Sequence, residues 1–285
     1  MAVRSRVSVV STVVVLCGVI ALGAMLYGWL EAGWLRTRVL DVPVAGLPAA
    51  LDGVRIAHLS DFHLGARLSR GNRASERAVA WVAARRPDLV CVTGDLVSHP
   101  RGEPRLRSLL AQLERPFVIL GNHDVAVTRD PFSRAAELRD LEQSVLLRDR
   151  AEVSALRGER LCVVGVDPET YEDRTARPWE LVDRETAFRL LLCHYPKVVE
   201  ALPPDAFQLV LAGHLHAGQI CLPGPFGRIP LTHPHARWVA GLYDLEGTAL
   251  HVSPGTGTTF VPFRFLARPE VTELVLRHDP RGGSS

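Results

Sequence analysis

The sequence predicts an α/β domain with a largely parallel sheet, preceded by one apolar N-terminal helix. Two observations predict the domain: short apolar runs alternate with longer charged segments through the first half of the chain, and the last third changes to short β-like runs rich in proline and glycine. A charge-free stretch near the N-terminus predicts the helix. The chain has 285 residues, 47% hydrophobic and 22% charged, which is enough for a sizeable core.

The N-terminal stretch at 7–30 carries no charged side chain and is long enough to cross a bilayer as a helix. Tyr27, Trp29 and Trp34 lie at its far end, where interfacial aromatic side chains are common. A cleaved signal peptide is the alternative, but the stretch is long for one and its sequence ALGA makes a poor cleavage site. We therefore expect an uncleaved, single-pass membrane anchor within residues 1–38.

The orientation of this anchor in the membrane stays open. Arg4 and Arg6 precede the apolar stretch, and Arg36 and Arg38 follow it. The positive-inside rule compares such charges, and here the comparison is nearly a tie.

Apolar runs and helical periodicity place the remaining elements in order along the chain. A linker bearing proline and glycine at 39–53 leads into one domain at 54–278, and a disordered tail follows at 279–285. The predicted strands are 54–59, 89–93, 117–120, 161–166, 189–193 and 207–212. The predicted helices are 70–85, 106–113 and 131–141, the last with Asp-Pro as its starting signal. The last third is expected to add hairpins and edge strands.

Charge and cysteine usage exclude two classes of protein. The net charge of +2 gives no electrostatic case for a nucleic-acid partner. The five cysteines form no CxxC pair, which indicates small core residues rather than a disulfide framework or a zinc knot.

Asp, Asn and His side chains follow five of the predicted strands, at the point where each strand ends. They are Asp61 and His63, Asp95, Asn122 with His123 and Asp124, His194, and His214 with His216. The carboxyl edge of an open α/β sheet is where such proteins build their sites. A single Asp after Gly usually belongs to a turn, and a single HxH motif is usually a pair of solvated histidines. Because such residues follow five different strands at equivalent positions, together they indicate a shared site.

Imidazole and carboxylate side chains together form a ligand set that suits Mn, Fe or Zn. Two cations about 3.5–4 Å apart need an anionic ligand in common. Asp95, a single carboxylate on the central strand, is the natural bridge.

The blocks SDFH, TGD, LGNHD, CH and AGHLHAGQ, in this order, resemble those of the calcineurin-like metallophosphoesterase family, over about residues 54–276. The blocks GHLHAGQICLPG, VSPGTG and RFLARPEVTELVL are similar to a membrane-associated bacterial branch of that family. The resemblance implies a four-layer αββα sandwich, with 54–278 as the metallophosphoesterase catalytic domain, held at a bacterial cell membrane by the N-terminal helix.

The resemblance also implies two divalent metal ions, with Mn favoured over Fe and Zn. The ligands of the first ion correspond to Asp61, His63 and His216. The ligands of the second ion correspond to Asn122, His194 and His214. Asp95 would bridge the two ions, His123 would lie over the phosphate, and Asp124 would fix the tautomer of the His123 ring.

The expected activity is hydrolysis of a phosphodiester or pyrophosphate bond by attack of a metal-bound hydroxide, with His123 as general acid or hydrogen-bond donor. A lipid-linked substrate such as a UDP-diacylglucosamine suits a tethered catalyst.

The alternative is a catalytically inactive phosphoesterase-like binding or scaffold protein, but no ligand is missing. A nuclease would share the chemistry, and the near-neutral charge and the anchor argue against it. The sequence does not indicate an oligomeric state.

Residues outside these blocks are expected to be structural. His58 is placed in or beside the first strand. The remaining histidines are expected on the surface or in loops: His99, His233, His235, His251 and His278. The alternative for His233 and His235 is a position at the edge of the site. The apolar loop at 220–231 could line a lipid-facing or substrate groove, but we expect it to pack against the domain.

Overall fold

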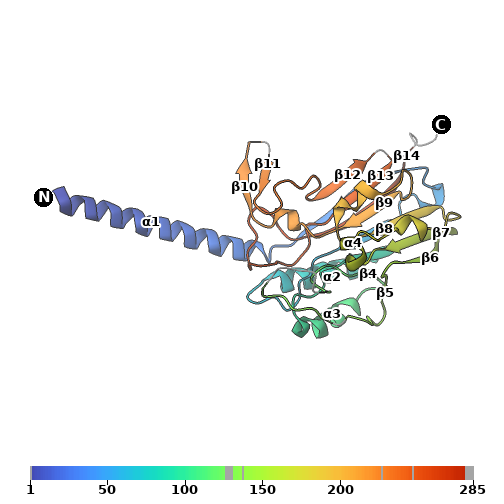
Figure 1. Cartoon of the computed structure of the whole chain (residues 1–285), viewed down its shortest axis with the longest axis horizontal. Helices are drawn as coiled ribbons and strands as arrows, with labels where there is room; N and C mark the ends of the chain where they lie inside the picture. Colours follow the sequence, from blue (N-terminus) through green and yellow to red (C-terminus); the bar gives the residue numbers. More distant parts are fainter. Residues whose placement is uncertain (1, 126–130, 137, 226, 246, 280–285) are drawn as a thin grey trace.

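Two six-stranded sheets form the centre of the domain in the computed structural model, which describes residues 2–279 apart from 126–130, 137, 226 and 246 (Figure 1). The first sheet has the order β1 (Arg36–Ala45), β14 (Glu270–Asp279), β2 (Arg55–Leu59), β3 (Leu89–Thr93), β4 (Phe117–Ile119) and β5 (Val145–Leu146). The second has the order β12 (Gly241–Leu245), β13 (Thr248–Val252), β9 (Leu209–Ala212), β8 (Phe188–Leu192), β7 (Glu159–Gly165) and β6 (Arg150–Leu156).

The helices and a separate hairpin complete the described elements. The α-helices are α1 (Ala2–Glu31), α2 (Gly71–Arg85), α3 (Glu103–Leu110) and α4 (Pro168–Glu172). The hairpin pairs β10 (Cys221–Gly224) with β11 (Gly227–Pro230). Short 3₁₀ turns occur at Ala49–Leu51, Pro100–Gly102, Pro178–Glu180, Pro196–Ala201 and His216–Gly218.

Most neighbouring strands are parallel. In the first sheet β2, β3, β4 and β5 run side by side in one direction, and β14 runs antiparallel to β2. In the second sheet β7, β8, β9 and β13 are parallel, with β6 and β12 antiparallel at the edges. The carboxyl ends of the parallel strands therefore meet at one edge of each sheet, where sites are usually built.

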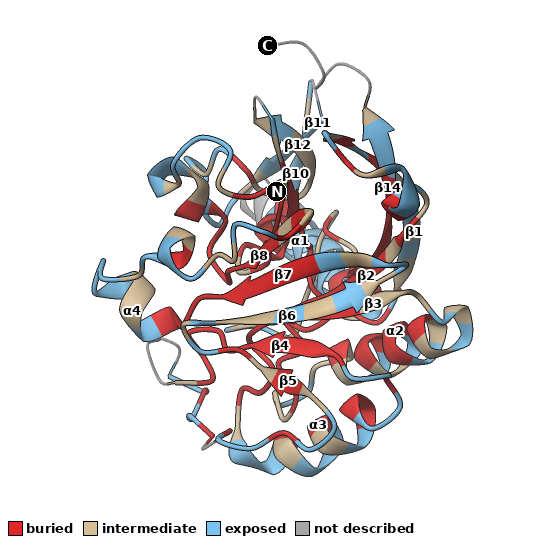
Figure 2. Cartoon of the chain, turned by 90° about the vertical axis from the view of Figure 1, so that its right-hand side faces the viewer, coloured by how far each residue is buried: buried red, intermediate tan, exposed pale blue. Residues whose placement is uncertain are grey.

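Apolar side chains separate the elements into four layers. Between the sheets, Cys91 of β3 belongs to the same buried core as Phe188 of β8. On the other face of the first sheet, Val90 and Val92 pack with α2 and α3, because successive strand residues point to opposite faces. A third core covers the outer face of the second sheet beside α4 and the 3₁₀ turn at Pro196–Ala201. Figure 2 shows α2 and α3 on the outer side of β4 and β5. The predicted αββα sandwich is confirmed.

Periodicity located most elements correctly. The predicted helix at 70–85 corresponds to α2, whose Ala74, Ala78, Val79 and Val82 are buried on one face. The predicted strands of both sheets correspond to β2, β3, β4, β7, β8 and β9 within a few residues.

The predicted helix at 131–141 is wrong. The described residues of this range, 131–136 and 138–141, form a turn followed by chain without regular secondary structure. The N–H of Arg134 donates to the carbonyl of Ser98, so the backbone pairs with a neighbouring loop instead of with itself. Ala136, Leu138 and Leu141 are still buried, in the core between the first sheet and its helices.

Two strands of the first sheet lie where the sequence did not predict them. β1 occupies much of the segment predicted as a linker, and Pro43 is compatible with this strand because β1 is at the sheet edge. β14 pairs with β1 and β2, so it lies inside the sheet and not at its edge. Of the predicted disordered tail, Asp279 ends β14 and 280–285 lie outside the described residues.

The apolar loop at 220–231 also differs from the prediction. Its described part forms the hairpin β10–β11, and Leu222 and Ile229, which pair across it, are 47% and 49% exposed. Helix α1 contains a stretch, Val10–Glu31, that is long and apolar enough to cross a membrane, and it extends away from the domain (Figure 1).

Replacing Phe188 should test the core between the sheets. Phe188 is fully buried there, so Phe188→Ala should lower the free energy of unfolding by about 3–5 kcal/mol. The measurement is urea unfolding of the full chain in detergent, followed by circular dichroism. Leu181→Ala, at a side chain 37% exposed, is the control and should change the same free energy by about 0.5 kcal/mol or less. Equal losses for the two variants would contradict the assignment of Phe188 to the core.

Candidate dinuclear metal centre

The candidate site lies where the carboxyl ends of strands from both sheets meet. β2 and β3 of the first sheet lead into Asp61 and Asp95, and β8 and β9 of the second lead into His194 and His214. The chain turns sharply at these ends. Five predicted ligands have positive φ angles: Asp61 (52°), His63 (47°), Asp95 (52°), His214 (73°) and His216 (50°). Such conformations are costly for residues with a Cβ and are concentrated at functional sites.

Glycine residues allow the site's loops to approach one another. A Cβ atom on Gly121 would lie 2.2 Å from Asp95 Oδ1, and one on Gly213 would lie 2.4 Å from Asp61 Oδ2. Both distances are far below van der Waals contact, so these positions exclude any side chain. The glycines that precede Asn122 and His214 are therefore part of the construction of the site.

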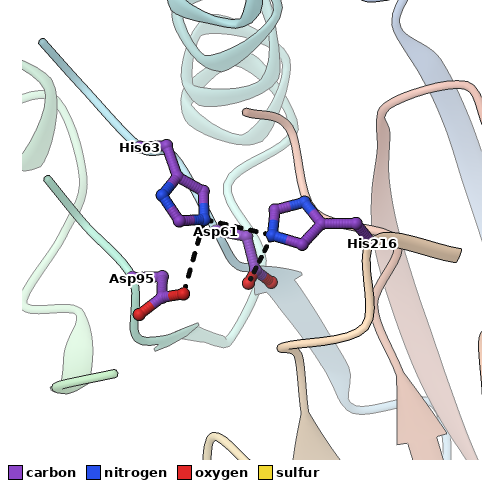
Figure 3. Close-up of side chains that lie close together, drawn as sticks. All are labelled: Asp61, His63, Asp95 and His216. Atoms are coloured by element: carbon purple, nitrogen blue, oxygen red, sulfur yellow. Dashed lines mark hydrogen bonds and ion pairs between the residues drawn. The ribbon is translucent and has the colours of Figure 1, made fainter. Parts of the chain in front are cut away.

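Four side chains converge in the first part of the site, and Figure 3 shows them pointing toward one another. His63 Nε2 lies 3.1 Å from His216 Nε2 and 3.4 Å from Asp95 Oδ2. His216 Nε2 lies 3.5 Å from Asp61 Oδ1. All four residues are buried, and their ligand atoms lie within 4.8 Å of one another. Two imidazole lone pairs that face each other repel unless a cation or a proton lies between them, so this donor set fits a metal ion.

Three further side chains surround Asp95 on its other side. His194 Nε2 lies 3.3 Å from Asp95 Oδ2 and 3.2 Å from His214 Nδ1. Asn122 Oδ1 lies 3.1 Å from His214 Nδ1. This second group offers two imidazole nitrogens, an amide oxygen and the shared carboxylate, which is again a set of borderline and hard ligands.

Asp95 belongs to both groups. Its Oδ2 atom contacts His63 in one group and His194 in the other, and its Oδ1 accepts the backbone N–H of His123 at 2.9 Å. One carboxylate is thus fixed between two sets of nitrogen donors, as a ligand shared by two cations requires. The structure brings all seven predicted ligands together.

Hydrogen bonds behind two of the rings direct their other nitrogen into the site. His194 Nδ1 donates to the carbonyl of Thr93 at 2.8 Å, so Nε2 is the ring nitrogen that faces Asp95. His63 Nδ1 lies 2.9 Å from Ser98 Oγ, and its Nε2 faces the ligand group. Partners of this kind orient metal-binding histidines and fix their tautomers.

Burial and neighbouring charges divide the histidines by protonation. Burial lowers the pKa of His63 and of His214 to about 3, so both rings are neutral at pH 7 and have lone pairs to offer. Burial also lowers the pKa of His194, but Asp95 outweighs this effect and raises it to about 9. Burial opposes ionisation of Asp95, yet His194 and His123 hold the pKa of its carboxyl well below the usual range. Burial raises the pKa of Asp61 to about 6.

His123 is buried beside the ligand groups without belonging to either. Its ring lies edge-on to that of His63, with centroids 4.7 Å apart. Its Nδ1 lies 3.0 Å from Ser133 Oγ, and its Nε2 lies 3.4 Å from Thr259 Oγ1. Sequence reasoning missed both hydroxyls, because single Ser and Thr residues in loops carry no recognisable pattern.

Asp124 differs from the prediction, because its carboxylate does not contact the His123 ring. It accepts three backbone N–H groups, from Leu96 at 2.9 and 3.1 Å, from Val97 at 3.0 Å and from Gly121 at 2.9 Å. These bonds tie the loop after β4 to the loop after β3. Asp124 therefore organises the backbone that carries Asp95 and Asn122.

Arg264 is a further residue that the sequence did not indicate. It is fully buried, and its guanidinium donates to the carbonyls of Pro254, Gly257 and Ala267 at 2.7–2.9 Å. Its Nη2 lies 3.1 Å from His216 Nδ1, so it supports the ring from behind. The only sequence signal was an arginine within the apolar run PFRFLA.

One other histidine differs from its predicted position, and a second lies near the site. His251 is fully buried in β13, where its Nδ1 lies 2.7 Å from that of His58, so the expected surface position is wrong. His233 is exposed in a loop as predicted, but its ring centroid lies 5.7 Å from that of His214, at the margin of the site.

Two cavities flank the centre. One, of about 430 Å³, is lined by Ser98, Ser133 and Thr259, which contact the site histidines, and otherwise mainly by apolar side chains. The other, of about 360 Å³, is lined by His214 and Tyr195 together with charged residues such as Lys197. Space for a bound molecule thus adjoins the site next to His123 and again next to His214.

Metal binding should depend on pH differently in the two groups. His194 must lose a proton to bind a cation, and its raised pKa means that it holds this proton at pH 7. The affinity of the second group for Mn²⁺ should rise with pH, by about tenfold per unit until pH approaches 9. The first group, with neutral rings, should show little change above pH 7. Calorimetry in buffers of different ionisation enthalpy should detect about one proton released for one of the two ions. Binding of both ions without proton release at pH 7 would contradict the protonation assigned to His194.

Comparison with known proteins agrees with this geometry. The family model of calcineurin-like phosphoesterases matches residues 54–218, more than half of the chain. A transmembrane protein with metallophosphoesterase domain from Danio rerio is 33% identical over 260 residues, covering 84% of this chain and 56% of that protein. YkuE, an uncharacterized metallophosphoesterase from Bacillus subtilis (strain 168), is 30% identical over 247 residues, covering 81% of this chain and 82% of YkuE. This chain thus spans little more than half of the length of the Danio rerio relative. The chain belongs to the calcineurin-like phosphoesterase family.

Proposed function

We propose that the protein is a membrane-anchored hydrolase that uses two divalent cations to cleave phosphodiester or pyrophosphate bonds. One observation carries the proposal: Asp95 Oδ2 lies within 3.4 Å of a ring nitrogen from each of two separate ligand groups. A shared carboxylate between two nitrogen-rich groups supports a dinuclear centre. We assign Asp61, His63 and His216 to one ion and Asn122, His194 and His214 to the other, with Mn²⁺ as the preferred metal.

The ions, when bound, would supply a hydrolytic nucleophile near neutral pH and neutralise charge on the phosphoryl oxygens. The chain's own residues would position these ions. The substrate would approach the ligand groups beside His123 and the two flanking cavities. Neutral His63 and His214 lower the cost of bringing the ligand sets together before any cation binds.

His123 is proposed to assist the departing oxygen of the substrate. Ser133 Oγ–H donating to Nδ1 would leave the ring proton on Nε2, which lies next to Thr259 in the wall of the apolar cavity. From there Nε2–H can donate a hydrogen bond or a proton to the leaving group. The hydrogen bond from the backbone N–H of His123 to Asp95 Oδ1 would hold His123 beside the proposed bridging ligand.

A substrate linked to a lipid, such as a UDP-diacylglucosamine, is the finer part of the proposal. Helix α1 supports attachment to a bilayer, and the cavity beside His123 is lined mainly by apolar side chains. A tethered enzyme meets membrane-bound substrates at a high local concentration. The inactive-scaffold alternative gains no support, because no predicted ligand is missing or displaced.

Replacing His123 should separate catalysis from metal binding. His123→Ala should keep two metal ions per chain and lose about 10²–10³-fold in kcat on bis-p-nitrophenyl phosphate, because only help to the transition state is removed. Asp95→Ala should lose bound metal as well as activity, since both groups share this carboxylate. Elemental analysis and a chromogenic assay, with and without chelator, measure the two properties.

His278→Ala is the matched control for these variants. β14 is antiparallel to β2, so His278 lies at the opposite end of the sheet from the site, and its replacement should leave both properties unchanged. Full activity of His123→Ala would remove this residue from the mechanism. A metal-loaded wild-type protein that hydrolysed no phosphoester would favour the scaffold instead.

A further inference from the structure

The last turn of α1 is built into the domain instead of being joined to it by a flexible linker. Glu31 is 1% exposed, and its carboxylate accepts the backbone N–H groups of Leu266 and Ala267 at 3.0 and 2.7 Å. One turn earlier, the carbonyl of Gly28 accepts the N–H of Arg264 at 3.0 Å. Arg264 also lies against His216, so the end of the helix and the metal centre share a support.

Aromatic side chains strengthen this attachment from several sides. Tyr27 packs edge-on against Phe265, with ring centroids 5.2 Å apart. Trp29 Nε1 donates to the carbonyl of Leu68 at 2.9 Å, and the Arg70 guanidinium lies 4.5 Å from the Trp29 ring. These contacts join the last turns of the helix to the domain, and Figure 1 shows the rest of the helix extending away from it.

The apolar stretch of the helix ends at this attachment. Residues 7–30 have no charge, and at 1.5 Å per residue they span about 36 Å, slightly more than the roughly 30 Å of a bilayer core. No length of helix is left over to hold the domain away from the membrane. The part of the domain around the foot of α1 must therefore lie at the bilayer surface whenever α1 spans it.

Exposed apolar side chains gather around that foot. Leu68, Phe132, Phe260 and Val261 are exposed by 83%, 69%, 53% and 38%, and all four line the cavity of about 430 Å³. The hairpin β10–β11 lies beside the foot of α1 (Figure 1). It is joined to Phe265, which packs on the helix, through a backbone bond from Cys221. Its exposed Leu222 and Ile229 complete what we name the helix-foot face.

Arginine side chains border this face. Arg67, Arg101 and Arg105 line a shallow depression next to Leu68, and all three are exposed. Exposed apolar side chains flanked by cationic ones are the composition of surfaces that lie at anionic membranes. Arg105 pairs with Glu76 at 2.6 Å, so the positive charge that complements phospholipid headgroups comes from Arg67 and Arg101.

The cavity connects this face to the catalytic residues. Its apolar rim consists of Leu68, Phe132, Phe260 and Val261, and its polar wall includes Ser98, Ser133 and Thr259. These three hydroxyls contact His63 or His123. An alkyl chain at the rim would place an attached phosphoester next to the ligand groups.

We infer that the helix-foot face docks on the bilayer and that the substrate reaches the metal centre from the membrane, with an alkyl chain between Leu68, Phe132, Phe260 and Val261. The substrate class is a membrane amphiphile whose phosphoester lies at the end of its chain. Access of the substrate from the membrane rests on the proposed function. Docking of the helix-foot face does not depend on catalysis.

Docking is tested with spin labels on the full chain in vesicles of phosphatidylcholine and phosphatidylglycerol. Phe260→Cys and Ile229→Cys should each carry a nitroxide that collides more with oxygen than with a water-soluble nickel complex. Leu181→Cys, also exposed but outside the face, should show the reverse. If the labels at 260 and 229 are as accessible to the nickel complex as the label at 181, docking on the bilayer is overturned. The face would then bind a protein partner or a second copy of the chain.

Substrate access is tested with two p-nitrophenyl phosphodiesters, one esterified with hexadecanol and presented in the vesicles, the other with methanol in solution. The wild type should prefer the hexadecyl ester, and Phe260→Asp should lower the ratio of the two kcat/KM values by about tenfold or more. Leu181→Asp should leave the ratio unchanged. Equal kcat/KM for the two esters in the wild type would overturn access from the membrane. Hydrolysis of neither ester would overturn the proposed function, while the spin labels would still decide docking.

Discussion

The site depends on one buried carboxylate that faces two groups of histidine nitrogens. Asp95 would be costly to bury alone, but His194 stabilises its charge and the backbone N–H of His123 donates a hydrogen bond to its Oδ1 at 2.9 Å. Oδ1 of this carboxylate accepts a hydrogen bond from the loop after β4, and Oδ2 faces the two ligand groups. The remaining contacts of the site arrange other donors around this charge.

The sandwich makes this arrangement possible. Each sheet alone delivers only part of the set, since Asp61, His63 and Asp95 follow the first sheet and His194, His214 and His216 follow the second. The apolar core between the sheets aligns their carboxyl ends, and Asp124 joins two of the loops through backbone N–H groups. Core packing is therefore the physical cause of the ligand geometry, and Arg264 extends the same framework to the foot of α1.

The sequence indicated which side chains meet at the candidate site because their positions follow a local rule. Each one directly follows an apolar strand, and parallel strands bring such positions together whatever the intervening loops do. Ser133, Thr259 and Arg264 could not be found in this way, because their partners lie about 10 to 136 positions away and their residue types are common in loops. Strand β1 escaped prediction because Pro43 reads as a linker residue, although an edge strand tolerates it. The segment 131–141 has helical periodicity, but tertiary hydrogen bonds and burial in the adjacent core determine its backbone.

The most direct test of the shared carboxylate is electron paramagnetic resonance of the protein loaded with Mn²⁺. Two ions that share Asp95 should lie about 3.5–4 Å apart and give the spectrum of an exchange-coupled pair at two equivalents per chain. The same spectrum should disappear in Asp95→Asn. Two equivalents of Mn²⁺ with the spectrum of isolated ions in the wild type would contradict the account, because it would show that no ligand joins the two groups.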